Sequence, residues 1–148
     1  MNKSLTRLLP VLLLALSLPL AASASEKTHR VILQVNDNDA DRMNLVLNNA
    51  SNVIAYYQEK NEPVEVEIVT YGPGLIMLIE GKSPVAERIK SFGQSYDNIG
   101  FKACANTRAK MEKKSGKKVM LLSEAKIVPS GVIHAVERQE QGWSYIKP

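Results

Sequence analysis

Short apolar runs alternate with longer stretches of helical spacing along this chain, and that alternation limits the fold more than any other feature. The clearest run is RVILQVN (30–36), in which Val31, Ile32 and Leu33 are consecutive rather than separated by polar residues. A strand of this kind is typical of a sheet whose two faces are both covered. We therefore predict a three-layer α/β/α domain around a mostly parallel sheet, with strands at 30–36, 64–72, 99–105, 125–128 and 143–148.

The segments between these runs have the spacing and the end signals of helices. After the first run, apolar residues recur every three or four positions as far as Tyr57, and either Asp37 or Asp39 can cap the helix start. A later segment offers Ser83 as a cap, followed by Pro84 at the first helical position, where proline is tolerated. We predict helices over 37–61, 83–98, 106–116 and 131–142, and a helical turn at 75–81.

The first 24 residues have the pattern of an export signal. Lys3 and Arg7 precede an apolar stretch (8–22), and Ala22-Ser23-Ala24 supplies the small residues that a signal peptidase requires. A membrane anchor is the weaker interpretation, because two prolines interrupt the stretch and a span needs roughly 20 apolar residues. We predict cleavage near Ala24, leaving residues 25–148 as a single exported domain with no stable membrane insertion and an irregular start at 25–29.

The charge of the mature chain points to no polyanionic partner. The whole sequence has a formal net charge of +4, and the predicted signal supplies two of its basic residues, which leaves about +2. Five lysines gather in the segment 110–118, where they fit the solvated face and the C-terminal end of one helix. Nucleic-acid binding would require aromatic residues interleaved with such a cluster, and this segment has none. We expect no nucleic-acid partner.

Cys104 is the only cysteine of the chain, so no internal disulfide can form. In an exported protein such a residue is an apolar filler, half of an intermolecular bridge or a reactive thiol. Dithiol chemistry of the thioredoxin type is excluded, because it requires a C-x-x-C pair. The position of the cysteine in the predicted fold therefore becomes the main functional question.

The predicted sheet places Cys104 at the edge where α/β proteins bind ligands, beyond the carboxyl ends of the strands. The same edge holds Asn36 after the first strand, the turn 72–74 after the second and the segment 129–131 after the fourth. Cys104 also precedes a helix that Asn106 or Thr107 can cap, so the helix dipole and free N–H groups favour its thiolate. Its burial as a structural residue remains the alternative.

The remaining candidate residues have simpler explanations. His134 lies among apolar residues of a predicted helix, where a core or boundary role is commoner than catalysis, although a Cys104–His134 dyad stays open. DNDAD (37–41) lacks the spacing of a calcium loop, so helix capping explains it better. The turn 72–74 lacks the lysine of a phosphate loop. One cysteine and two histidines make a weak zinc set, and we expect no metal and no organic cofactor.

Five motifs are spread along the predicted mature chain between Arg30 and Pro148: RVILQVNDND, VEIVTYGPGLIMLI, GFKACANT, VPSGV and QGWSYIKP. In this order and spacing they resemble the DsrE/DsrF-like proteins, specifically their exported, single-domain branch. The resemblance implies a five-stranded, mainly parallel sheet, and homo-oligomers that are commonly trimers or hexamers. In the sulfur-relay members a cysteine carries sulfur as a persulfide between protein partners, and Cys104 matches that position. This chain has Ala105 where related exported proteins often have glycine.

These observations predict a periplasmic sulfur-handling protein, a carrier or sulfurtransferase that exchanges sulfane sulfur with a donor or acceptor protein. Cys104 would be the nucleophile, and Arg108 and the backbone amides of the following helix would stabilise its thiolate. Residues expected to shape the binding pocket are Asn36, Gly72, Pro73, Gly74 and Asn106. The alternative is a non-enzymatic ligand-binding or assembly module in which Cys104 is structural. An exported hydrolase that uses Cys104 and His134 is a third possibility.

Overall fold

The computed structural model describes residues 28–148, and the predicted signal segment 1–24 and its cleavage site lie outside them. Five strands alternate with four α-helices and one 3₁₀ helix. The elements are β1 (His29–Val35), α1 (Ala40–Glu59), β2 (Val64–Thr70), η1 (Gly72–Leu78), α2 (Ala86–Ser95), β3 (Ile99–Cys104), α3 (Ala105–Ser115), β4 (Ala125–Val128), α4 (Gly131–Glu140) and β5 (Ser144–Ile146). The predicted strands are therefore confirmed, and β4 has the predicted bounds.

All five strands belong to one sheet, in the order β4-β3-β2-β1-β5. Every neighbouring pair is parallel, which confirms and extends the prediction of a mostly parallel sheet. The register places Thr70 of β2 beside Ala103 of β3, and Cys104 beside Val128 of β4. The carboxyl ends of β2, β3 and β4 consequently lie next to one another.

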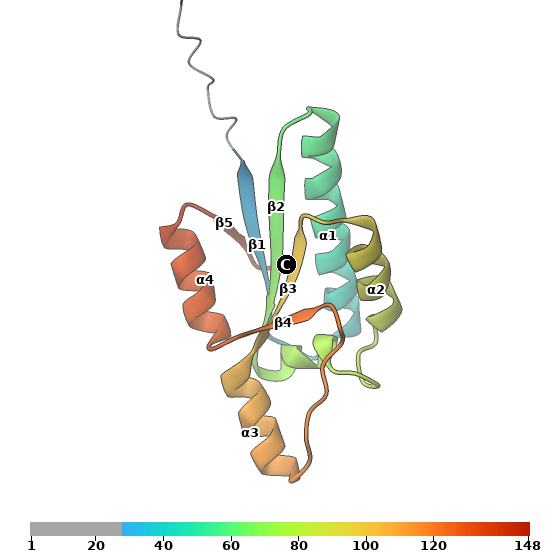
Figure 1. Cartoon of the computed structure of the whole chain (residues 1–148), viewed down its shortest axis with the longest axis vertical. Coiled ribbons are helices and arrows are strands. Elements are labelled where there is room, and N and C mark those ends of the chain that lie inside the picture. Colours follow the sequence, from blue (N-terminus) through green and yellow to red (C-terminus); the bar gives the residue numbers. More distant parts are fainter. Residues whose placement is uncertain (1–27) are drawn as a thin grey trace, which may run out of the picture.

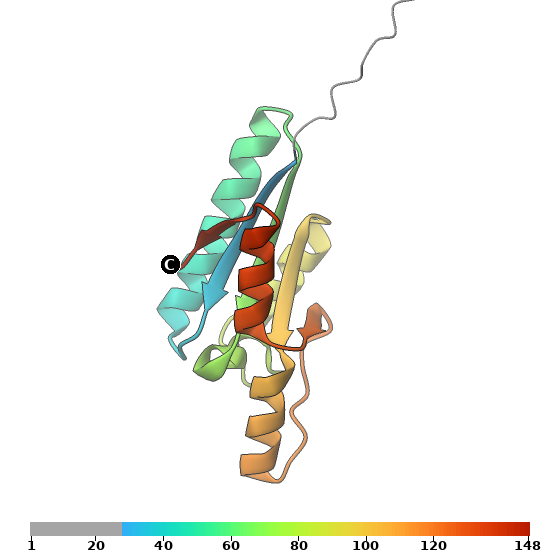
Figure 2. The same cartoon turned by 90° about the vertical axis from the view of Figure 1, so that its left-hand side faces the viewer.

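Helices cover both faces of the sheet and give the three predicted layers (Figures 1 and 2). The α1 and α2 helices lie on one face, where the larger apolar cluster includes Leu33, Ile68 and Phe101. On the other face α4 packs over a smaller cluster made by Ile32, Val69, Ala135 and Trp143. Adjacent residues of β1 thus enter different clusters, which is why its apolar run is continuous.

One of the two proposed caps for α1 is confirmed, and the predicted start of α2 is wrong. Asp39, not Asp37, caps α1, because its side chain accepts hydrogen bonds from the N–H groups of residues 41 and 42. The prediction for α2 was wrong by two residues, since the helix begins at Ala86 rather than Pro84. Val85 is buried and its backbone is non-helical (φ −126°, ψ 20°), while Ser83 Oγ accepts only the Val85 N–H.

The start of β1 also differs from the prediction. His29 was assigned to an irregular segment, yet it is the first residue of β1 and pairs with Val64. Its ring stacks on Tyr57 with centroids 3.9 Å apart, and its Nε2 lies 2.8 Å from Glu62 Oε2. These two contacts explain why the strand begins earlier than its apolar run.

The α3 helix projects past the carboxyl ends of the strands instead of covering the sheet (Figure 1). None of its residues is buried, and the lysines of the segment 110–118 are all exposed, which agrees with a solvated helix face. Gly116 ends the helix in a left-handed conformation (φ +66°), as predicted. No helix within residues 28–148 has the length and apolar character needed to cross a membrane.

Candidate functional site

Cys104 lies at the edge of the sheet from which α3 and α4 run in different directions. It is the last residue of β3 and the N-cap position of α3, which continues beyond the strand ends. The neighbouring strand β4 ends at Val128 and leads into α4, which covers the face opposite α1 and α2 (Figure 2). Cys104 therefore lies beyond the carboxyl ends of the strands, the edge at which parallel sheets bind ligands.

The first residue of α4 packs directly against Cys104. A Cβ atom placed on Gly131 would lie 3.3 Å from Cys104 Cβ and only 2.8 Å from Cδ1 of Tyr71. Such a separation is shorter than real side chains tolerate, so only glycine fits at this position. The close approach brings the N-terminal end of α4 to the thiol. Cys104 therefore faces the positive ends of two helices, α3 and α4.

The surroundings of the Cys104 thiol favour its ionised form. Burial raises the pKa of Cys104, but hydrogen bonds outweigh it, so the pKa lies below its ordinary value. The largest of these bonds comes from the Thr107 side chain, and the backbone N–H groups of Gly131, Thr107 and Asn106 add to it. Cys104 is only 4% exposed, yet it belongs to neither apolar cluster. Its neighbours include hydrogen-bond donors as well as the buried Val128 of β4.

Two backbone contacts hold the loops around the thiol in place. The N–H of Gly72 donates to Thr107 Oγ1 over 3.0 Å, which joins the turn after β2 to the first turn of α3. The N–H of Asn106 donates to the carbonyl of Pro129 over 3.3 Å, which joins α3 to the loop before α4. Because Thr107 Oγ1 accepts from Gly72, its own hydroxyl hydrogen is free to donate to the Cys104 sulfur.

The predicted site residues on the turn after β2 have different roles in the structure. Gly72 reaches the Cys104 site through Thr107. Gly74 packs against the end of β1, where a side chain would collide with the backbone of Val35 and Asn36. Asn36 and Gly74 thus fix the turn rather than face the thiol. Pro73 lines a separate groove of about 460 Å³ between η1 and α3.

Of the two predicted site residues on α3, one acts on Cys104 and the other does not. The backbone N–H of Asn106 donates to the Pro129 carbonyl and also lowers the pKa of Cys104, while the residue itself is exposed. Arg108, which we expected to stabilise the thiolate, directs its Nε at Glu112 Oε1 over 3.2 Å. The helix cap also differs from both predicted choices, because Cys104 itself occupies the N-cap position.

A group of polar side chains beside Cys104 was not predicted. Tyr71 is half-buried against Gly131, and burial raises its pKa, with the nearby Tyr145 adding to the rise. The Gln34 side chain bonds to the Tyr145 hydroxyl and also to Tyr71, which lowers the Tyr71 pKa in part. Gln34 interrupts the apolar run of β1 between Leu33 and Val35, and that is the sequence signal that marks this cluster.

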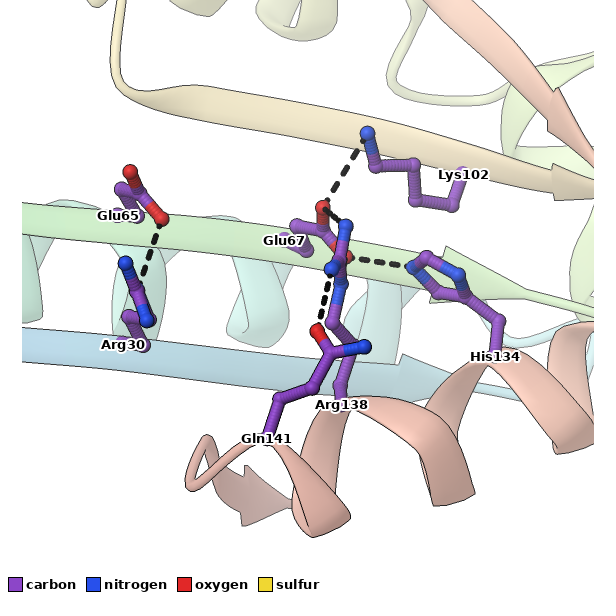
Figure 3. A network of polar contacts seen from close by, with 7 residues as sticks. All are labelled: Arg30, Glu65, Glu67, Lys102, His134, Arg138 and Gln141. Carbon is purple, nitrogen blue, oxygen red and sulfur yellow. Dashed lines mark hydrogen bonds and ion pairs between the residues drawn. The ribbon is translucent and has the colours of Figure 1, made fainter.

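His134 points at the buried carboxylate of Glu67 (Figure 3). Its Nε2 lies 2.6 Å from Glu67 Oε2, in the middle of β2 under α4. Arg138 donates to both oxygens of Glu67, at 3.0 and 2.8 Å, and Lys102 Nζ lies 3.3 Å from Oε1. Within residues 28–148 no hydrogen bond joins His134 to Cys104. His134 is therefore oriented toward Glu67, and it is not placed to act as the base that the hydrolase hypothesis requires at Cys104.

Burial raises the pKa of Glu67, but hydrogen bonds from Arg138 and His134 and the charge of Lys102 hold it below its ordinary value. Glu67 is therefore an ionised carboxylate under α4. Its sequence signal was a carboxylate on a strand predicted to be covered on both faces. Among residues 28–148, no three His, Cys, Asp or Glu side chains gather closely enough to hold a metal ion.

Comparison with known proteins gives one informative similarity. No protein-family model matches the sequence, and no curated protein matches it either. The solved structure of MTH1491 from Methanobacterium thermoautotrophicum, a protein of unknown function, superimposes on this chain with a TM-score of 0.67 and 33% sequence identity. The similarity covers 81% of this chain and 99% of MTH1491.

Proposed function

This chain belongs to the same family as MTH1491, whose function is unknown, and we propose from its own site that it handles sulfur by carrying sulfane sulfur on Cys104. The resemblance of its motifs to the DsrE/DsrF-like proteins supports this proposal, because Cys104 matches the persulfide-carrying cysteine of the relay members. The chain would act as a carrier or sulfurtransferase between protein partners. No cofactor is needed for that chemistry.

The observation that carries the proposal is the set of donors around a single thiol. A filler cysteine needs no hydrogen-bond donors, whereas the Thr107 side chain and the backbone N–H groups of Gly131, Thr107 and Asn106 lower the pKa of Cys104. These groups stabilise a thiolate, which is the nucleophilic form of cysteine.

The transfer step conserves electrons overall and requires no external oxidant. The Cys104 thiolate attacks the outer sulfur of a donor persulfide, and a new S–S bond forms between the two. The S–S bond of the donor breaks, and the donor leaves as a thiolate. The proton on the transferred sulfur stays with it. The product is a persulfide on Cys104, and the same exchange in reverse passes the sulfur to an acceptor thiol.

Sulfur loading tests the proposal directly. The folded protein is incubated with a small-molecule persulfide, and intact mass is measured before and after reduction. We expect a gain of one sulfur atom that a reductant removes, and none in Cys104→Ala. Cys104→Ser is the matched control, because it keeps a side chain of similar size at the same position. Equal loading of the wild type and Cys104→Ala would reject the proposal.

A binding or assembly module is the second candidate, and the burial of Cys104 favours it. With only 4% exposure, the sulfur cannot meet a donor unless a neighbouring group moves. In this alternative Cys104 only fills space between α4 and the strand ends. The two candidates differ in one cheap observation, since a filler thiol resists alkylation until the protein unfolds.

We further propose that the protein is a periplasmic homo-oligomer, a trimer or a hexamer. Its support is the amount of apolar surface on α4, where Val132, Ile133 and Val136 are each more than 40% exposed. Exposed apolar patches of this kind are typical of association surfaces. Light scattering of the purified protein after size exclusion would give the number of subunits, and a monomer at micromolar concentration would contradict this part of the proposal.

A further inference from the structure

A polar groove on the α4 face of the sheet is separate from the Cys104 site. It has a volume of about 570 Å³ and runs beside the C-terminal half of α4 toward the amino ends of β2 and β3. Its lining includes Gly100, Lys102, Lys126, Arg138 and Trp143. A volume in this range suits a small organic molecule rather than a single ion.

The floor of the groove carries more positive than negative charge. Glu67 is the carboxylate at the centre of the buried cluster there, and its side chain is 8% exposed. Two permanent cations, Lys102 and Arg138, contact it in addition to His134 (Figure 3). One carboxylate neutralises only one of these cations, so the buried cluster keeps a net positive charge. Net charge in such a place is costly unless a counter-charge can reach it.

Lys102 is the cation whose bonding is least complete. Its side chain is 15% exposed, and its partner within residues 28–148 is a single Glu67 oxygen at 3.3 Å. An ammonium has three N–H donors, so this one contact does not use its full capacity. Gly100 makes this pose possible, because a Cβ there would lie 3.1 Å from Lys102 Nζ. The side chain is thus folded back over glycine into the groove.

A second lysine stands directly beside the first. Lys102 of β3 and Lys126 of β4 are register partners, and side chains paired in this way point to the same face of a parallel sheet. Both line the groove. Like charges directly opposite on neighbouring strands destabilise a sheet. An anion held between the two ammonium groups would remove that repulsion and satisfy the free donors of Lys102.

The acidic residues of the groove do not supply this anion. Glu65 is paired with Arg30 over 3.2 Å at the far end of the lining (Figure 3). Asp97 belongs to the exposed loop before β3. Neither residue forms an ion pair with Lys102 or Lys126 within residues 28–148. The lysine pair therefore stays available to a ligand.

We propose that this groove binds a small organic anion, with a carboxylate or phosphate group between Lys102 and Lys126. Trp143, over whose ring the Arg138 guanidinium lies at 4.8 Å, closes one side of the groove. The ligand site does not depend on the sulfur chemistry of Cys104. It would exist equally in a protein whose cysteine is structural.

Calorimetric titration with two probes tests the site, at low ionic strength against a chloride-matched blank. Succinate represents the carboxylate source of the anion, and inorganic pyrophosphate represents the phosphate source. We expect saturable binding of at least one probe, and the tighter one identifies the source. Binding should weaken about tenfold or more in Lys102→Met and in Lys126→Gln, the loss expected for one charged hydrogen bond.

Two features of the design keep the result decisive. Lys102→Met leaves Glu67 bound to Arg138 and His134, and Lys126 is exposed, so both variants are expected to fold. Lys110→Gln is the matched control, because it removes an exposed lysine from α3, away from the groove. Binding of neither probe by the wild type would overturn the proposal. So would equal weakening in all three variants, which would indicate general charge screening rather than a site.

Discussion

The backbone N–H of Gly72 donates to Thr107 Oγ1 over 3.0 Å, and this contact fixes the hydroxyl that hydrogen-bonds to Cys104. Thr107→Val removes the hydroxyl but keeps the shape of the side chain. Because that hydroxyl is the strongest group lowering the Cys104 pKa, we expect the pKa to rise toward its ordinary value. The pH dependence of iodoacetamide labelling measures the change.

Thr107→Ser supplies the control, since serine retains the hydroxyl. We expect its labelling profile to resemble that of the wild type much more closely than that of Thr107→Val. If the valine and serine variants give the same profile as the wild type, the hydroxyl does not act on the thiol, and the backbone N–H groups alone determine the pKa.

Gly131→Ala tests the close approach of α4 to the site. The new Cβ would lie 2.8 Å from the ring of Tyr71, so α4 has to shift. Overpacking of this kind costs about 1–3 kcal/mol in the free energy of unfolding. The shift also moves the Gly131 N–H away from Cys104, and the Cys104 pKa should rise.

Urea denaturation and thiol labelling measure the two effects of Gly131→Ala separately. Glu140→Gln, at an exposed polar position of the same helix, is the control, and it should change both quantities little. An unchanged labelling profile in a clearly destabilised Gly131→Ala would show that α4 supports the fold but not the thiolate.

Glu67→Gln tests the buried ion cluster under α4. The amide leaves Arg138 and Lys102 without their carboxylate. Removing one partner of a buried pair costs roughly 3–5 kcal/mol, and we expect the lower end because Arg138 is partly exposed. Denaturant unfolding at neutral pH gives the value.

The pH dependence of this cost has a definite sign. The pKa of Glu67 is lowered by folding, so its carboxylate stabilises the protein above the unfolded pKa of about 4.3. That stability is lost as the pH falls through the lower pKa of the folded state. The difference in unfolding free energy between the wild type and Glu67→Gln should therefore be constant above about pH 5 and shrink below about pH 4. A difference that stays constant to lower pH would mean that Glu67 is not the titrating group.

His134→Gln separates the sulfur-carrier hypothesis from the Cys104–His134 dyad. Because His134 Nε2 binds Glu67, its loss should lower stability without changing the labelling profile of Cys104. Glutamine can still donate to Glu67, which keeps the variant folded. A labelling profile that moves to higher pH in His134→Gln, with Glu67→Gln unaltered, would restore the dyad and the hydrolase hypothesis.

The strand pattern of the fold was accessible from the sequence because both faces of the sheet are covered. The apolar residues of β1 are consecutive because both faces of the strand are buried. Gly116 marks a helix end because it has the left-handed conformation that ends α3. The start of α2 was not accessible in the same way. Pro84 is compatible with a first helical turn, but Val85 is buried in the core and its backbone is not helical, so α2 begins only at Ala86.

Only part of the candidate site could be predicted from the sequence. The position of Cys104 follows from the order of strand and helix, and the sequence alone placed it at the correct edge. The groups that act on it were harder to find, since Gly131 comes from a distant segment and Thr107 is oriented by Gly72. Arg108 was expected at the thiol because it is near in sequence, but a partner one helical turn away, Glu112, engages it.

The rate of Cys104 alkylation in the folded protein, measured against pH by intact mass, tests the central claim most directly. The account predicts labelling in the native state, with an apparent pKa below the value of about 8.5 of a free cysteine. The Thr107→Val variant should need a higher pH for the same rate. Labelling that occurs only after denaturation would contradict the account, and would identify Cys104 as a structural residue of a binding or assembly module.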